Sequence, residues 1–509
     1  MKKKLLWNAL ILTATSLLLR TIGLSFRVYL SNKIGPEGMG LYQLIFSVYM
    51  LAATFATSGI STAVTRLAAE ENHRGPQNVH YIMKRAFTFS IFLSLTAALI
   101  LFVFADAIGH LWLHDGRTVG ALKILSFSLP FVSLSSCLRG YFFALRKAGI
   151  PASAQVLEQL VKIFLIINIW NYLQPQELET ACMAIVAGNV IGEALSCIYV
   201  LIFYGLQSRK NRPRTVVQVS KGLLRRLLHI ALPVAASSYL RSSLKTLENV
   251  MIPLALEKSG TSNQNSLKEY GMLKGMVMPI LTFPSAFLTA FSTLLVPEIS
   301  EANALQHQKQ VNYTISRVFQ LTALFSILVT GIFMMFSEAL GLVIYKNQEI
   351  GKTLRLLAPL VPLLYFDRVV DGILKGLNQQ VSSLKYNIID SLTRIGMIYY
   401  LIPIKGFEGF VLVVFISNIL NSFLSIGRLL RVTNLKLRAF RWFVLPIFCV
   451  TAAGIATAML LQTLHLPELS AGMTLSLEIA VVSLLYLLFL RLLRCISRED
   501  IRWFKGILR

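Results

Sequence analysis

About fourteen apolar runs, each long enough to cross a bilayer, constrain the fold of this chain more than any other feature. A membrane-spanning helix needs roughly 17–25 mostly apolar residues, and continuous rather than alternating runs exclude a membrane β-barrel. Of the 509 residues, 55% are hydrophobic and 14% are charged, about half the charge of an average soluble domain. The sequence therefore predicts an all-α polytopic membrane protein. Its predicted spans are 5–30, 39–67, 82–109, 119–145, 151–173, 181–206, 226–256, 272–300, 313–343, 351–377, 383–402, 407–431, 441–464 and 471–496.

Basic residues are distributed unevenly between the two sides of these spans. Of 49 lysines and arginines, 31 lie on the side of the N-terminus, nine on the other side and nine within spans. The positive-inside rule then places both termini in the cytoplasm. The start Met1–Lys4 resembles a signal peptide, but Arg20 lies within the run and no small-residue cleavage site follows. We therefore expect a retained first helix. The basic segment 209–226 suits anionic lipids rather than nucleic acid.

The second half of the chain repeats the first. Leu122–Pro130 matches Leu354–Pro362 at an offset of 232 residues, Gly40 matches Gly271 at 231, and Arg20 matches Arg241 at 221. Each repeat has an even number of predicted helices, so both keep one orientation, as parallel repeats do around a central pathway in transporters. The predicted division is 1–206 (N-lobe), 207–225 (basic cytoplasmic linker), 226–431 (C-lobe related by a pseudo-twofold axis) and 432–509 (two extra helices and a basic tail).

The first and seventh predicted helices carry polar stripes at helical spacing. An arginine near the middle of a bilayer costs at least about 2.5–3.5 kcal/mol, so its presence in two matching helices indicates a function. We expect a cationic cavity that binds an anion, because guanidinium groups donate paired hydrogen bonds to phosphate. The alternative is structural pairing with Glu158, Asp390 or backbone carbonyls. The candidate substrate-binding residues are Ser16, Arg20, Arg27, Ser237, Arg241 and Lys245.

Other ionisable residues within spans allow three further interpretations. Glu158/Lys162 and Asp390/Arg394 have the i, i+4 spacing of structural charge pairs. Glu248, Asn387 and Asp390 are candidates for coupling to Na⁺ or H⁺. Arg139 and Asp371, at matching positions, are a candidate gate or an ordinary salt bridge.

No enzyme motif is present in the sequence. It lacks a Walker A sequence, HExxH and a GxSxG in a soluble context, and its five cysteines show neither a metal pattern nor a disulfide framework. We expect no enzymatic activity and no cofactor beyond a coupling ion. Without a nucleotide-binding domain, transport would use an ion gradient, the membrane potential or the substrate gradient.

Three segments resemble a known family. They are Arg20–Arg27 (RTIGLSFR), Ile34–Tyr42 (IGPEGMGLY) and Gly59–Glu70 (GISTAVTRLAAE). They are similar to the opening of sporulation proteins in the polysaccharide transporter branch of the multidrug/oligosaccharidyl-lipid/polysaccharide (MOP) flippase superfamily. The 6+6+2 helix organisation extends the resemblance over the whole chain.

The resemblance implies a V-shaped, two-lobed fold that works by alternating access in a bacterial plasma membrane. It implies a flippase for undecaprenyl-pyrophosphate-linked oligosaccharide, lipid II above all, in peptidoglycan and spore cortex synthesis. By motif position, Arg20 and Arg27 would lie in the central cavity, with Arg241 as their counterpart. A sodium site of some relatives is matched only loosely by Glu248, Asn387 and Asp390. We expect a monomer whose partners are the lipid-linked substrate, anionic lipids and cell-wall synthesis enzymes.

Three other functions remain open at this point. The chain could flip another polymer precursor, such as that of teichoic acid, O-antigen or capsule. It could be an ion-coupled drug antiporter, although cation-exporting relatives carry an acidic residue in the first helix where this chain has arginines. It could also be a non-transporting membrane scaffold for cell-wall synthesis enzymes, which should tolerate loss of the cavity arginines.

Overall fold

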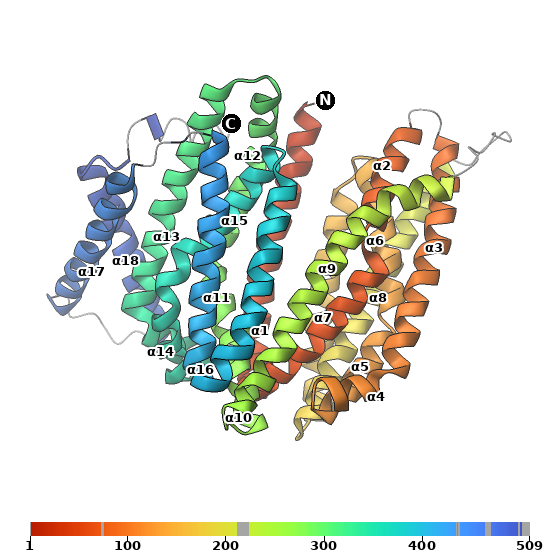
Figure 1. Ribbon diagram of the computed structural model, residues 1–509, viewed down its shortest axis with the longest axis horizontal. Helices are drawn as coiled ribbons and strands as arrows, with labels where there is room; N and C mark the ends of the chain where they lie inside the picture. Colours follow the sequence, from red (N-terminus) through yellow and green to blue (C-terminus); the bar gives the residue numbers. More distant parts are fainter. Residues whose placement is uncertain are drawn as a thin grey trace. The chain divides into compact units, whose positions relative to one another are not determined.

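The apolar runs fold into helices. The structure, a computed structural model, describes residues 2–72, 76–210, 223–433, 435, 438–463, 470–496 and 499–500, and contains no strand among them. The chain divides into two compact units (Figure 1): unit 1 is Met1–Gly271 with Ile398–Gly406, and unit 2 is Met272–Met397 with Phe407–Arg509. The predicted all-α fold class is confirmed.

Unit 1 begins with two helical segments joined without a loop. α1 (Lys2–Thr57) is interrupted at Gly35, whose φ of 69° lies in the left-handed region that glycine adopts without strain. The other elements of unit 1 are α2 (Ile60–Asn72), α3 (Pro76–Val103), α4 (Ala105–Ala107), η1 (Ile108–Trp112), η2 (Gly116–Thr118), α5 (Val119–Ser126), α6 (Leu129–Ala144), α7 (Gly149–Leu173), α8 (Leu178–Lys210), α9 (Leu223–Lys258) and α10 (Asn263–Tyr270).

Unit 2 begins at Met272, within the π-helix η3 (Gly271–Val277). Its longest helix, α16 (Gln380–Thr433), is interrupted at Gly406 (φ 54°), the last residue of the stretch Ile398–Gly406 that belongs to unit 1. The other elements are α11 (Met278–Thr282), α12 (Ser285–Ala304), α13 (Gln308–Tyr345), α14 (Gln348–Leu357), η4 (Ala358–Leu360), α15 (Val361–Gly376), η5 (Phe440–Val444), α17 (Leu445–Thr463) and α18 (Ala471–Leu492).

Many of these helices are suited to a membrane. In the described part of the chain, eight are long and apolar enough to cross one, or ten if each of two bent pairs is a single span. Two of the eight, Ala14–Glu71 and Gln380–Thr433, contain the interruptions at Gly35 and Gly406, so each holds more than one helical segment. α9 has 36 residues but is not among the eight. The count of fourteen therefore stays a prediction.

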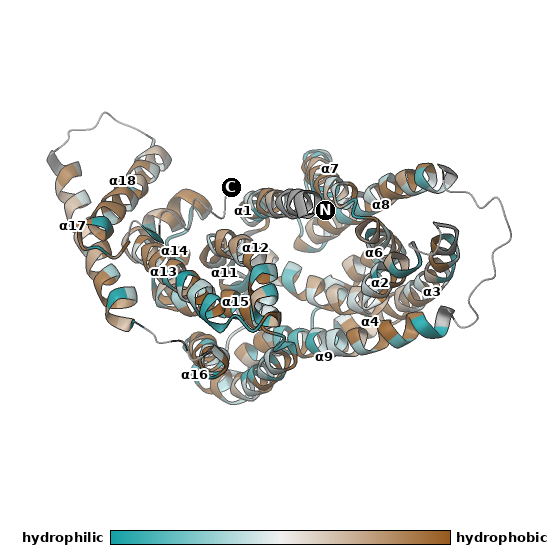
Figure 2. Ribbon diagram, turned by 90° about the horizontal axis from the view of Figure 1, so that it is seen from above, coloured by the Kyte–Doolittle hydropathy of each residue, from teal (hydrophilic) through white to brown (hydrophobic). Residues whose placement is uncertain are grey.

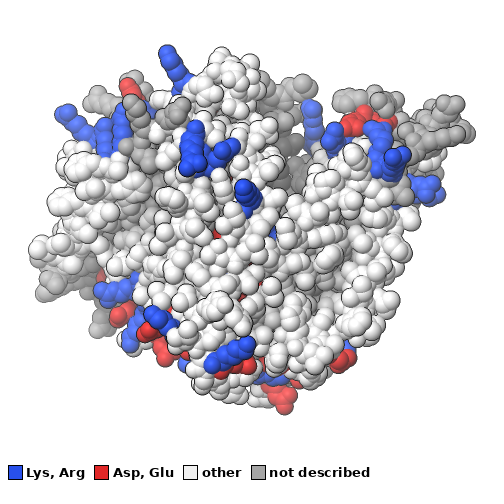
Figure 3. Space-filling model, viewed as in Figure 1, with Lys and Arg blue, Asp and Glu red and all other residues white. Residues whose placement is uncertain are grey.

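The outer faces of the helices are apolar. Figure 2 shows that hydrophobic residues predominate over most helices of both units, and large side chains such as Phe92 (68% exposed), Phe164 (66%) and Leu484 (67%) are mostly uncovered by protein. Exposed apolar side chains in such number are suited to contact with lipid. On the face seen in Figure 3, Lys, Arg, Asp and Glu side chains gather toward the two ends of the helices, leaving a broad band largely of other residues.

Each unit has its own buried core. In unit 1, α2, α3 and α6 pack around residues such as Ile60, Ile82 and Phe142, and the buried hydroxyl of Ser133 donates to the Ala56 carbonyl at 2.7 Å. In unit 2, α13 packs against α17 and α18, where the Tyr486 hydroxyl donates to the Leu324 carbonyl at 2.9 Å. Polar side chains inside the bundles thus hydrogen-bond to neighbouring helices, as they must away from water.

A long seam joins α9 to the second segment of α1 and to α2, all within unit 1. Asn249 Nδ2 donates to Ser47 Oγ at 2.9 Å and Tyr239 Oη to the Phe55 carbonyl at 3.1 Å. Farther along, Arg226 pairs with Glu70 and Glu71 at 3.0 and 3.1 Å. Residue numbers fall along α9 as they rise along α1 and α2, so the two chain segments run antiparallel.

A reciprocal contact lies at the other end of this helix pair. A Cβ placed on Gly40 would lie 2.1 Å from the Leu267 carbonyl oxygen, and one on Gly271 would lie 2.0 Å from that of Pro36. Gly40 and Gly271 are equivalent in the sequence repeat at an offset of 231, and so are Pro36 and Leu267. The contact of Gly40 with Leu267 therefore has the equivalent contact of Gly271 with Pro36 as its counterpart. This exchange of equivalent residues is the local relation that a twofold axis requires. Superposition of the complete repeats stays a prediction.

The compact units and the predicted lobes divide the chain differently. The units separate at Gly271, whereas the sequence repeat predicts lobes 1–206 and 226–431, because the seam adds α9 and α10 to unit 1. The predicted linker lies largely outside the described residues.

Candidate functional site: a cationic face on α1 and α9

The candidate anion-binding residues lie on α1 and α9, both in unit 1. Arg20, Arg27, Arg241 and Lys245 are all exposed. Among the described residues, none of the four forms a hydrogen bond or an ion pair with another side chain. The choice between an anion-binding cavity and structural pairing stays a prediction. Exposed cations within apolar helices are suited to an external anion.

The seam fixes which faces of α9 remain available. Tyr239, Thr246 and Asn249 contact α1, since Thr246 Oγ1 donates to the Ser47 carbonyl at 3.0 Å in addition to the bonds described above. Arg241 follows Tyr239 by two residues and therefore points to nearly the opposite side of the helix. α9 is held by one face and presents its arginine on the other.

The two candidate serines have different environments. Ser16 is exposed on α1. Ser237 is partly buried, and its hydroxyl donates to the Val234 carbonyl of its own helix at 2.9 Å. Such a bond satisfies the hydroxyl hydrogen locally, so Ser237 would offer a ligand its oxygen as an acceptor, which does not suit an anion.

Asp390 and Arg394 form an ion pair on α16 in unit 2. The Ser417 hydroxyl donates to Asp390 Oδ1 at 2.6 Å, and Arg394 Nε reaches Ser417 Oγ at 2.8 Å. The side chain of Asp390 is only 6% exposed. Carboxylate, guanidinium and hydroxyl thus form a closed group that neutralises its own charge, as the sequence predicts for a structural pair.

The matching pair in unit 1 is arranged differently. Glu158 and Lys162 on α7, both described, form no ion pair with each other. Lys162 lies within electrostatic range of Glu193 on α8 as well as of Glu158. The two i, i+4 pairs therefore differ between the repeats although their sequences match.

The three candidate ion-coupling residues are divided between the units. Glu248 is buried (2% exposed) on α9 in unit 1. Asn387, in unit 2, donates to the Ser383 carbonyl at 2.8 Å, and Asp390 is engaged with Arg394. In the described part of the chain, no three His, Cys, Asp or Glu side chains are grouped as metal ligands. Ion coupling through these residues stays a prediction.

The candidate gate residues have local partners. Asp371 on α15 forms an ion pair with Lys375 at 2.6 Å and accepts a hydrogen bond from Ser383. Arg139 on α6 lies within electrostatic range of Glu158. Each residue thus interacts within its own unit, and a gate or salt bridge formed by Arg139 and Asp371 stays a prediction.

Sequence analysis missed two polar groups. In unit 1, Glu193 on α8 accepts from Tyr49 and Asn189. In unit 2, Asn421 Nδ2 donates to Asp367 Oδ1 at 2.7 Å, and Arg368 donates to Ser285 Oγ at 2.6 Å. An acidic residue within an apolar span was the available signal for Glu193, but its hydroxyl partner lies 144 residues away in sequence.

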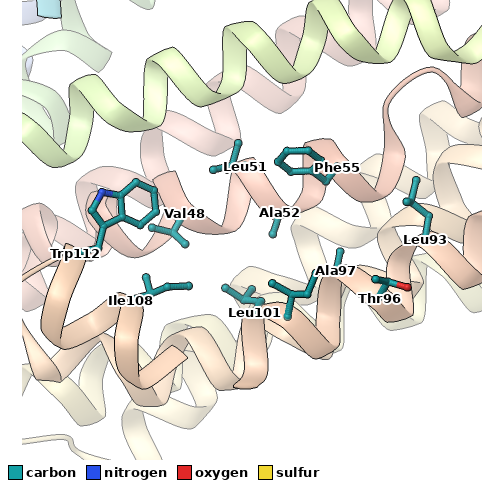
Figure 4. Close-up of a pocket in the computed structure, with 11 residues that line it drawn as sticks. Val48, Leu51, Ala52, Phe55, Leu93, Thr96, Ala97, Leu101, Ile108 and Trp112 are labelled. Carbon is teal, nitrogen blue, oxygen red and sulfur yellow. The ribbon is translucent and has the colours of Figure 1, made fainter. Parts of the chain in front are cut away.

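An apolar pocket of about 310 Å³ lies between α1, α3 and η1 in unit 1 (Figure 4). Thr96 is the one hydroxyl-bearing residue among those that line it, beside residues such as Leu51, Phe55, Leu101 and Trp112. A pocket of this composition suits hydrocarbon and offers nothing to a phosphate.

Comparison with known proteins now places the chain in a family. Residues 5–303, more than half of the chain, match the model of the family described as "Polysaccharide biosynthesis protein". The chain belongs to this family. Among curated relatives of the polysaccharide biosynthesis family, stage V sporulation protein B of Bacillus subtilis (strain 168) is 27% identical over 98% of both chains. Lipid II flippase MurJ of the same strain is 25% identical over 84% of this chain and 83% of its own.

Solved structures show the same fold. Lipid II flippase MurJ in an inward closed conformation aligns with a TM-score of 0.70 over 98% of this chain and 100% of its own, at 14% identity. An inward-facing multidrug resistance MATE transporter of the MOP superfamily aligns at 0.62 over 84% of this chain and 98% of its own, at 16% identity. The predicted MOP fold is thus confirmed, and the chain is a multi-pass membrane protein of the polysaccharide biosynthesis family.

Proposed function

We propose that the chain is a flippase that moves undecaprenyl-pyrophosphate-linked oligosaccharide, lipid II above all, from the inner to the outer leaflet. The observation that carries the proposal is the set of exposed, unpaired cations on α1 and α9: Arg20, Arg27, Arg241 and Lys245. The names of the relatives support it, since one is a lipid II flippase and another a sporulation protein.

The proposed mechanism assigns each part of the substrate to a matching environment. The diphosphate binds the guanidinium groups, which stay charged and donate paired hydrogen bonds. The polyprenyl tail remains in lipid, so the unfavourable transfer of this apolar chain into water is avoided. Alternating access then exposes the sugar to the outer side. An antiporter for cationic drugs fits less well, because this face of α1 carries arginines instead of a carboxylate.

Loss of one guanidinium should weaken diphosphate binding. A charge-assisted contact is worth about 1.5–3 kcal/mol, so Arg20→Ala, Arg27→Ala and Arg241→Ala should each lose roughly tenfold to a hundredfold in affinity. Arg20→Lys should restore only part of the affinity, because lysine keeps the positive charge but lacks the planar guanidinium group that donates paired hydrogen bonds. The measurement is flipping of fluorescent lipid II in proteoliposomes, with binding by native mass spectrometry.

Arg66 supplies the control, because its exposed side chain pairs with Glu70 one helical turn away. Arg66→Ala should flip lipid II normally. If Arg20→Ala and Arg241→Ala also flip it normally, these residues do not form an anion site. If both variants are lost from the membrane, these residues are structural braces rather than an anion site.

We further propose a plasma-membrane location with both termini in the cytoplasm, based on the 31-to-9 distribution of basic residues. The five native cysteines are buried, so introduced ones can be labelled over a low background. An impermeant maleimide should label Lys346→Cys in intact cells and spare Arg438→Cys. Both sites are exposed, so the reverse pattern would invert the topology.

A further inference from the structure

A group of polar side chains deep in unit 1 has no role in the proposal above. The Tyr49 hydroxyl on α1 donates to both carboxylate oxygens of Glu193 on α8, at 3.0 and 2.9 Å. Asn189 Nδ2 donates to Glu193 Oε1 at 2.9 Å, and Ser128 Oγ donates to Tyr49 Oη at 2.8 Å. Tyr49 is 2% exposed and Asn189 is 4% exposed. The orientation of the Glu193 carboxylate is therefore fixed from two helices.

Lys162 on α7 lies within electrostatic range of this carboxylate, of Glu158 and of Arg27. Its ammonium group lies over the rings of Phe26 and Phe46, at 5.9 and 5.7 Å from their centroids, a distance at which a ring face attracts a cation.

A close contact between α7 and α8 brings these groups together. A Cβ on Gly192 would lie 3.2 Å from the Glu158 carbonyl oxygen and 3.3 Å from Lys162 Cβ. Gly192 directly precedes Glu193 in sequence. The absence of a side chain at residue 192 thus lets the Glu158–Lys162 turn approach α8 beside the Glu193 carboxylate.

Three cations and two carboxylates lie in this region. Arg139 and Lys162 lie within electrostatic range of Glu158, and Arg27 and Glu193 lie within electrostatic range of Lys162. Lys162 is only partly covered by protein and Arg27 is exposed, so both cations are open to an external anion.

The corresponding cation of the second repeat is closed off. Arg394, at the position matching Lys162, is bound by Asp390 and by the Ser417 hydroxyl. In the first repeat, Lys162 forms no ion pair with Glu158 and lies within electrostatic range of the exposed Arg27.

We propose that Lys162 contacts the diphosphate together with Arg27, and that Glu193, fixed by Tyr49 and Asn189, is a positioning residue for Lys162. This inference rests on the proposed function and adds to it. Arg27 would bind one phosphate through its fork, and Lys162, a compact point charge, the other. Lys162 should therefore matter more for a diphosphate than for a monophosphate.

The test compares undecaprenyl diphosphate with undecaprenyl monophosphate, each bound to the full-length protein in nanodiscs and quantified by native mass spectrometry. Lys162→Gln should lose about tenfold to a hundredfold in diphosphate affinity and much less for the monophosphate. Lys162→Arg should keep the preference for the diphosphate. Glu193→Gln should weaken diphosphate binding in the wild-type background and add no further loss to Lys162→Gln, because it acts through that lysine.

The control is Lys147→Gln, whose exposed ammonium binds Gln207 at 2.6 Å, and which should bind both lipids normally. An equal loss for both lipids in Lys162→Gln marks a structural defect and overturns the inference. So does unchanged diphosphate binding by Lys162→Gln while Arg27→Ala loses it, a result that leaves the proposed function intact. If Arg27→Ala and Arg20→Ala also bind normally, the proposed function fails as well.

Should Lys162→Gln not reach the membrane, Glu193→Gln decides the question. A selective loss of diphosphate binding that Glu193→Asp partly restores supports the positioning role. Unchanged binding by Glu193→Gln overturns it.

Discussion

Alanine at Gly40 or Gly271 should prevent normal folding of unit 1. Each added Cβ would lie about 2 Å from a backbone oxygen of the opposing segment, and backbone atoms cannot move aside as a flexible side chain can. The cost should exceed the about 1–3 kcal/mol typical of overpacking. Fluorescence-detected size-exclusion chromatography after heating should show a large fall in apparent melting temperature or no folded protein.

Gly149 provides the matched control in the same unit, because a Cβ there meets nothing within 4 Å. Gly149→Ala should be neutral or slightly stabilising, since alanine favours a helix by up to about 1 kcal/mol over glycine. The Gly40→Ala/Gly271→Ala double variant should cost less than the sum of the single variants, because both separate the same two backbones. Normal stability of either single variant would refute the crossing.

Removal of Asp390 should cost about 3–5 kcal/mol of stability, because Arg394 would keep its charge in a largely buried position without a carboxylate. The Ser417 hydroxyl would lose its acceptor at the same time. The measurement is the apparent melting temperature of Asp390→Ala in detergent. Adding Arg394→Met should recover most of the loss, since an apolar side chain of similar length needs no partner.

The exposed Asp371–Lys375 pair is the control for this prediction. It has the same i, i+4 spacing, but its side chains are 35% and 50% exposed, so Lys375→Ala should cost less than about 1 kcal/mol. If Asp390→Ala is as stable as the wild type, the ion pair is not a brace. If Asp390→Ala/Arg394→Met is stable but inactive, Asp390 has a role in transport, as the ion-coupling interpretation predicts.

The helices could be predicted from hydropathy because a bilayer imposes a minimum apolar length. The span predicted at 151–173, for example, is found as α7, which begins at Gly149 and ends at Leu173. The predicted spans 383–402 and 407–431 form one element, α16, interrupted at Gly406. Hydropathy detects the two spans, whereas the joint depends on one positive φ angle that apolar content does not encode.

The polar groups were only partly predictable. The sequence repeat identified Asp390 and Arg394, and the structure joins them in an ion pair. The repeat could not show that Glu158 and Lys162 lack such an ion pair, since i, i+4 spacing allows a pair but does not require one. The side chain that competes for Lys162 is Glu193, which comes from another helix and has no acidic counterpart in the repeat. Such competition depends on how α7 and α8 pack, which sequence spacing does not reveal.

The Gly40–Gly271 crossing also has an evolutionary consequence. A half-length ancestor with one such glycine would have met a second copy of itself at this point, with the same residue on both sides of a symmetric dimer. Any mutation of that codon would have introduced two side chains into one contact at once. After duplication and fusion, each glycine could mutate alone. Both glycines are present in this chain, and each would still bring an added Cβ to about 2 Å from a backbone oxygen of the other repeat, so the contact leaves no room for even one side chain.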